Sequence, residues 1–130
     1  MGSGINKVFL LGKITYIEVV HTPGGLVVAN LSIETTEEWK DAQKKDKSRT
    51  EAHRVIFYNK KAELIKESGQ KGHYVHIEGA LRTEKYEKDG ITKWATKIIG
   101  SNIQFLDIRD DYSQLKVTPN NYSTTMDAPF

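Results

Sequence analysis

Hydrophobic and polar residues alternate with a period of two along much of the chain up to residue 106. Successive side chains of a β-strand point to opposite faces, so this alternation, rich in β-branched and aromatic residues, predicts strands. Turn-forming sequences separate them at residues 21–25, 41–47 and 88–90, and the last contains an Asp-Gly pair that favours a hairpin. We expect five strands, near residues 5–12, 27–39, 49–58, 73–86 and 92–106.

Residues 59–68 follow a different pattern. Asn59 is a suitable N-cap, apolar residues occupy positions 62, 64 and 65, and a Gln-Lys-Gly sequence follows, so we predict a single helix. Three strands, a helix and two strands is the element order of the oligonucleotide-binding (OB) fold, a five-stranded Greek-key barrel. The prediction is therefore an all-β OB-fold with one inserted helix.

Several expected strands are longer than a small barrel requires. We therefore expect the hairpins at residues 37–51 and 84–93 to project beyond the barrel as arms, which are suited to binding. Residues 1–109 then form one domain. Residues 110–125 are polar and lack periodicity, which predicts a disordered linker, and residues 126–130, Met-Asp-Ala-Pro-Phe, form a separate C-terminal tip.

Composition excludes several classes of site. The 130 residues include no cysteine, so disulfides, thiolate zinc sites and cysteine nucleophiles are excluded. The apolar run at residues 8–11 is too short for a membrane span, and we expect a soluble, cytoplasmic protein. Residues 1–109 carry a net charge of +4 and residues 110–130 a net −2, a balance that suits a polyanionic ligand.

Aromatic and basic residues are interleaved in the expected arms and the third strand. Single-stranded nucleic acid is bound by such pairs, because bases stack on flat rings while cations neutralise phosphates. The alternative is that the rings belong to the core, and Trp94 fits a core or subunit-contact position equally well. The pairs are Trp39 with Lys40, Tyr58 with Lys60 and Lys61, Tyr86 with Lys85 and Lys88, and Trp94 with Lys93.

No constellation of residues indicates catalysis. His73 and His76 are three apart on an expected strand, so they point to opposite faces and do not share a metal ion. His53 lacks suitably spaced partners for a general base. The acidic residues Asp107, Asp110 and Asp111 fit a solvated linker better than a divalent-cation site. We therefore predict a protein without enzymatic activity, metal or cofactor.

Four internal motifs and the tip resemble one family. The motifs are GINKVFLLGKI, VVANLSIETTEEWKD, TEAHRVIFYNKKAE, KGHYVHIEGALRTEKYEKDG and the terminal DAPF. Together they resemble the bacterial-type single-stranded DNA-binding protein (SSB) family over residues 4–106 and the tip. The resemblance implies an OB-fold that assembles as a homotetramer and wraps single-stranded DNA in replication, repair and recombination.

The resemblance also implies roles for individual residues. The family's stacking aromatics fall on Trp39, Tyr58 and Tyr86, whereas its fourth stacking position is Ala52 here. We hypothesise that Trp94 compensates for Ala52. A basic residue is common where Glu84 stands, and His53 matches a subunit-contact histidine. With Lys40 and Lys85 from the interleaved pairs, the basic candidates for DNA binding are Lys7, Lys40, Arg54, Lys60, Lys71, Arg82 and Lys85.

The C-terminal tip matches the family's partner-docking segment through Asp127, Pro129 and Phe130. In the family, the terminal ring and carboxylate enter a basic-rimmed apolar pocket on helicases, nucleases, primase and recombination mediators. A single aspartate precedes Ala128, so we expect weaker and more salt-sensitive docking than a fully acidic tip would give. The resemblance places the protein in the cytoplasm, associated with the nucleoid.

Four alternatives stay open. A primosome-type relative binds single strands but lacks the tail. A phage or mobile-element variant would fit the short linker and the tip with its single aspartate. A nuclease would use the acidic residues at 107–111 with Mg²⁺. An RNA-binding OB-fold is disfavoured by the long arms and the tip.

Overall fold

The computed structural model describes residues 2–109 and the side chains of residues 2–106. The elements follow the predicted order: β1 (Val8–His21), β2 (Val27–Lys40), β3 (Asp46–Tyr58), α1 (Lys60–Ser68), β4 (His73–Lys88) and β5 (Ile91–Arg109). The predicted linker and tip lie outside the described residues.

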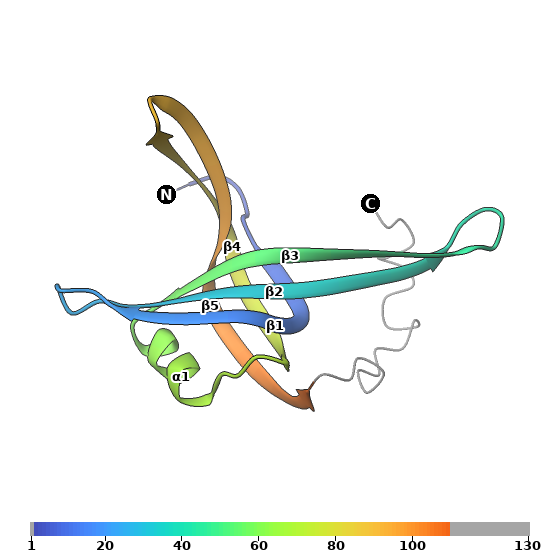
Figure 1. The fold of residues 1–130 in the computed structure, drawn as a ribbon, viewed down its shortest axis with the longest axis horizontal. Coiled ribbons are helices and arrows are strands. Elements are labelled where there is room, and N and C mark those ends of the chain that lie inside the picture. Colours follow the sequence, from blue (N-terminus) through green and yellow to red (C-terminus); the bar gives the residue numbers. More distant parts are fainter. Residues whose placement is uncertain (1, 110–130) are drawn as a thin grey trace.

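The strands form a closed barrel in the order β1-β2-β3-β5-β4, with β1 also paired to β4 (Figure 1). Neighbouring strands are antiparallel except β3 and β5, which pair in parallel through Val55 with Ile98 and Ile56 with Ile99. A five-stranded closed barrel with a helix between β3 and β4 is the OB-fold, so the fold prediction is confirmed.

The extent predicted for the first strand is wrong. Instead of ending at residue 12, β1 runs from Val8 to His21, with its first half paired to β4 and its second half to β2. The register shifts between Ile14 and Tyr16, and beyond that point Ile17 and Val19 pack against the core. An irregularity of this kind breaks the period of two, which hid the second half of the strand from pattern analysis.

The core is closed by α1 and by close packing around Phe57. Phe57 is fully buried, and its ring occupies the space that a Cβ atom at position 100 would need, which explains Gly100. In α1, Ala62 and Ile65 are buried against the barrel. Asn59 is the N-cap, as predicted, and its carbonyl accepts a 2.9 Å hydrogen bond from the Glu63 N–H, but its φ is 58° and its side chain makes no capping hydrogen bond.

Both predicted arms are present. The β2–β3 ribbon stays paired as far as Lys40 and Asp46, and the β4–β5 ribbon as far as Lys88 and Ile91. Figure 1 shows the two ribbons leaving the barrel in different directions. The second ribbon turns at Asp89 and Gly90, both with positive φ, as the Asp-Gly pair predicted. Among the described residues, no helix is long and apolar enough to cross a bilayer.

Candidate nucleic-acid interface

The three rings assigned to stacking lie far apart. Trp39 is near the tip of the β2–β3 arm, where it pairs with Lys47 of β3. Tyr58 lies at the opposite end of the ribbon, eleven residues beyond Lys47 along β3. At the rise of a strand, this separation is roughly 35 Å. Tyr86 lies on the other arm, where its side chain is 44% exposed. The rings therefore form separate platforms, and a single ligand must be a long polymer to reach all of them.

The β4–β5 arm presents an aromatic ring on each of its two faces. Tyr86 pairs with Lys93 on one face, and Trp94 pairs with Lys85 on the other. Trp94 is 65% exposed, so the alternative that it is a core residue is wrong. The Lys85 Nζ lies 5.9 Å from the centroid of the Trp94 ring, which is within cation–π range.

The Tyr86 face of this arm is strongly basic. Arg82 and Lys88 share it from β4, and Lys93 and Lys97 share it from β5. Glu84 is the acidic residue of this face and forms an ion pair with Lys97. The hydrogen bond from Lys97 lowers the pKa of Glu84 below its ordinary value, with smaller contributions from the charges of Lys97 and Arg82. Lys97, which the sequence analysis missed, is therefore engaged within the arm.

The basic candidates differ in how free their charges are. The Lys7 Nζ lies 2.8 Å from a carboxylate oxygen of Glu78, and the Lys40 Nζ lies 3.3 Å from one of Asp46. Lys85 contacts the Trp94 ring. The remaining candidates are exposed and form no ion pair or ring contact with a described residue; they are Arg54, Lys60, Lys71 and Arg82. These side chains are available to phosphate groups without breaking an internal pair.

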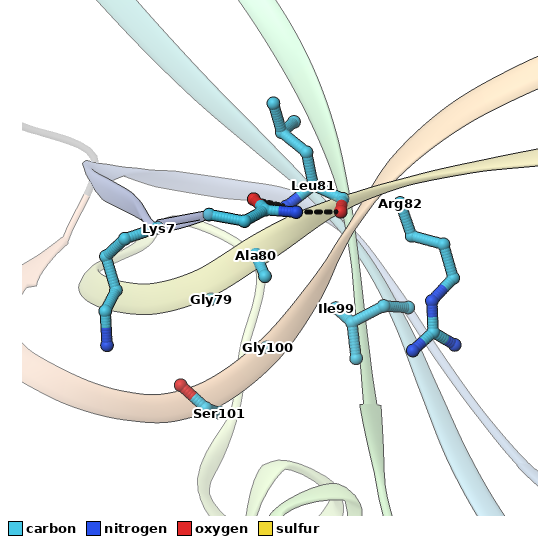
Figure 2. A pocket seen from close by; sticks show the side chains of 9 residues that line it. Lys7, Gly79, Ala80, Leu81, Arg82, Ile99, Gly100 and Ser101 are labelled. Atoms are coloured by element: carbon cyan, nitrogen blue, oxygen red, sulfur yellow. Dashed lines mark hydrogen bonds between the residues drawn. The ribbon is translucent and has the colours of Figure 1, made fainter. Parts of the chain in front are cut away.

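A depression of about 460 Å³ lies at the base of the β4–β5 arm. Figure 2 shows Lys7 and Arg82 on either side of it, with Ser101 near Lys7. Asn6 fixes the N-terminal segment here: its Nδ2 donates to the Leu81 carbonyl and its Oδ1 accepts from the Leu81 N–H, both at 2.8 Å. Arg82, which forms no ion pair with a described residue, is the cation beside this opening that suits a phosphate group, whereas Lys7 is already paired with Glu78.

Asn6 and Ser101 also belong to this depression, and the sequence analysis missed both. Asn6 acts through a contact with a residue 75 positions away, so no local pattern marks it.

The histidines make contacts within the chain. His53 is partly buried, and its Nε2 forms a 2.8 Å hydrogen bond with the Thr35 hydroxyl. His76 stacks on Phe9 with ring centroids 6.2 Å apart, and His73 lies 6.2 Å from Phe105 in a tilted arrangement. No group of three or more metal-ligating side chains occurs among the described residues. The role of His53 as a subunit contact stays a prediction.

Several candidate positions lie outside the described part of the chain. These are the docking residues Asp127, Pro129 and Phe130 and the acidic Asp110 and Asp111, and the side chain of Asp107 is likewise not described. Their roles therefore stay predictions from the sequence.

Comparison with known proteins gives one consistent result. The model of the single-strand binding protein family matches residues 5–106. The fold is similar to a Plasmodium falciparum SSB in complex with single-stranded DNA, with a TM-score of 0.75, 32% sequence identity, and coverage of 82% of this chain and 99% of that one.

Two structures of the single-stranded DNA-binding protein from Thermus aquaticus are also similar, each over 82% of this chain. A deletion mutant matches with a TM-score of 0.74 and 30% identity, and the wild type with 0.72 and 28%. The match spans 53% and 52% of those two chains, about half of their length.

Proposed function

Because the chain belongs to the single-strand binding protein family, we propose that it binds single-stranded DNA without sequence preference and carries out no reaction. The observation that supports this most strongly is the placement of rings beside cations on two long arms, with Tyr86 and Trp94 exposed on the β4–β5 arm and Trp39 partly buried near the tip of the β2–β3 arm. A small substrate would need convergent groups in one cleft. Rings dispersed over tens of ångströms instead suit a flexible polymer with many stacking faces.

The energetics favour tolerance of sequence. Each base stacked on an aromatic ring contributes about 1–3 kcal/mol, and every base has a flat face. Cations along the path neutralise phosphates and release counterions, a contribution that is equally independent of sequence. The rings of Trp39, Tyr58 and Tyr86 and the free cations Arg54, Lys60, Lys71 and Arg82 supply both contributions.

We also propose that the domain assembles as a homotetramer. Large apolar side chains stay exposed on the single chain, including Phe9 at 62% and Leu81 at 51%, and a second copy would bury them. His53 is the residue we assign to a subunit contact. In a tetramer, a DNA strand that is bound to one subunit would meet the rings of the next subunit at a high effective concentration, which would raise the overall affinity.

In the cell, the proposed role is to coat single strands exposed in replication, repair and recombination. The C-terminal tip, through Asp127, Pro129 and Phe130, would recruit helicases, nucleases, primase or recombination mediators. Burial of a phenylalanine ring stabilises such a complex by roughly 2–3 kcal/mol, and carboxylates add salt-sensitive charge pairing. Anisotropy of a labelled peptide of the last residues, titrated with a partner enzyme at several salt concentrations, tests this role.

The proposed function is tested by fluorescence anisotropy with labelled oligo-dT, a DNA hairpin and an RNA oligonucleotide of equal length. We expect tight binding to oligo-dT and much weaker binding to the hairpin. Tighter binding to the RNA than to the DNA would favour the RNA-binding alternative and contradict the proposal. Shortening of the labelled DNA after incubation with Mg²⁺ would instead indicate a nuclease.

A further inference from the structure

Three side chains from three neighbouring strands line up on one face of the sheet. Tyr16 of β1 pairs with Ser32 of β2, and Ser32 pairs with Arg54 of β3. Paired residues point to the same face, and neighbouring strands lie about 4.8 Å apart, so Tyr16 and Arg54 are about 10 Å apart at the backbone. The small Ser32 lies between them. The row is therefore a slot with an aromatic wall and a guanidinium wall.

A cavity of about 420 Å³ occupies this place. Its lining includes Tyr16, Ser32 and Arg54, and the short side chain of Ala52 leaves it open next to Arg54. The Tyr16 side chain is 50% exposed, and Arg54 is exposed and makes no ion pair with any described residue. Both walls are thus free to contact a ligand.

We propose that this cavity is a nucleotide subsite in which one base of the DNA strand inserts between the Tyr16 ring and the Arg54 guanidinium. The proposal rests on the proposed function and adds a site to it. Stacked planes lie about 3.4 Å apart, so a base between two flat groups needs walls about 7 Å apart. The backbones that carry Tyr16 and Arg54 are two strand spacings apart, which leaves room for the two side chains and a base stacked between them.

Charge orients the bound nucleotide. Arg54 attracts the phosphate, whereas Glu18, which also lines the cavity, repels it. The backbone of the strand therefore passes on the Arg54 side. Glu18 and Asn30 form the next row across β1 and β2, and they face the polar edge of the base. Stacking of bases on tyrosine rings and arginine planes is a recurrent mode of single-strand binding.

The subsite is continuous with the Tyr58 platform. Tyr58 lies four residues beyond Arg54 on the same face of β3, roughly 16 Å from Tyr16 across the sheet. A strand running diagonally over this face contacts both rings. Trp94, our earlier candidate to compensate for Ala52, lines neither this cavity nor the one of about 170 Å³ on the other side of Ala52. Tyr16, in contrast, lines the same cavity as Ala52.

The test is the affinity of full-length variants for a short labelled oligo-dT, measured by anisotropy at several salt concentrations. We expect Tyr16→Leu to bind at least about fivefold more weakly than the wild type, because one stacking interaction is lost. Tyr16→Phe keeps the ring and binds within about twofold of the wild type. Leu64→Ala is the control, since it removes an exposed apolar side chain from α1 and leaves the affinity unchanged.

A second variant examines the other wall. Arg54→Lys keeps the charge at an exposed position but removes the flat group, so the affinity falls while the slope of log affinity against log salt is retained. Wild-type affinity in Tyr16→Leu, or an equal loss in Leu64→Ala, overturns the subsite while the proposed function stands. A wild-type protein that does not bind oligo-dT overturns both.

Discussion

The ion pair on the β4–β5 arm makes the most specific electrostatic prediction. Glu84 holds Lys97 on the face that also carries Arg82 and Tyr86, so one cation is withheld from phosphate. Glu84→Gln keeps the size of the side chain and removes its charge. Lys97 is then free to make one additional phosphate contact, and the face loses its acidic residue.

The magnitude follows from counterion release. One additional contact with a single strand steepens the slope of log affinity against log salt by about 0.7. If Glu84→Gln and the wild type bind equally at about 1 M salt, the steeper slope makes the variant bind roughly fivefold more tightly than the wild type at about 0.1 M. The assay is an anisotropy titration of a short oligo-dT over a series of salt concentrations, which yields both affinity and slope.

Glu87→Gln is the matched control for this prediction. Glu87 is an exposed glutamate on the same strand that makes no ion pair with a described residue, so its removal frees no lysine. We expect its slope to equal that of the wild type. An unchanged slope in Glu84→Gln, or an equal change in both variants, would refute the reasoning.

The pKa shift of Glu84 sets the pH range in which the pair persists. Because the folded-state pKa lies below the ordinary value, the stabilising contribution of the pair is present above the unfolded-state pKa and is lost as the pH falls through the folded-state pKa. Between pH 7 and pH 5 the pair is therefore intact, and Glu84→Gln should differ from the wild type by the same slope at both values.

Two further predictions concern the fold and the arm. Phe57→Ala removes a fully buried ring, so the free energy of unfolding should fall by about 3–5 kcal/mol in a urea titration, and a loss below about 1 kcal/mol would contradict the described packing. Asn6→Ala removes two hydrogen bonds to Leu81, together about 1–3 kcal/mol, and hydrogen exchange should accelerate at the base of the β4–β5 arm. Unchanged exchange there would show that Asn6 does not fix the arm.

Much of the fold was predictable because most strands keep a regular alternation. The patterns around residues 27–39, 73–86 and 92–106 each coincide with a strand of the barrel, and the Asp-Gly pair coincides with the arm turn. The second half of β1 was not predictable, because the register shift after Ile14 changes which residues face inward. Asn59 occupies the N-cap position that the sequence predicted, but its backbone has a positive φ and its side chain does not cap the helix.

The candidate interface was predictable residue by residue but not as an arrangement. Tyr86 and Trp94 are marked by neighbouring lysines in the sequence, and the structure shows both exposed. Which face each ring occupies depends on the register between β4 and β5. The same limit applies to the pairing of Glu84 with Lys97 and to the slot between Tyr16 and Arg54, since these contacts cross strands and carry no local signal.

The central claim is that bases stack on Trp39, Tyr58 and Tyr86 while nearby cations neutralise the phosphates. The most direct measurement is the affinity for poly-dT of a variant with leucine at all three positions, with a variant that carries phenylalanine there as the control that keeps every ring. We expect at least about a hundredfold loss in the leucine variant, from about 1–3 kcal/mol per ring, and near wild-type affinity in the phenylalanine variant. Equal binding by the wild type and the leucine variant would contradict the claim.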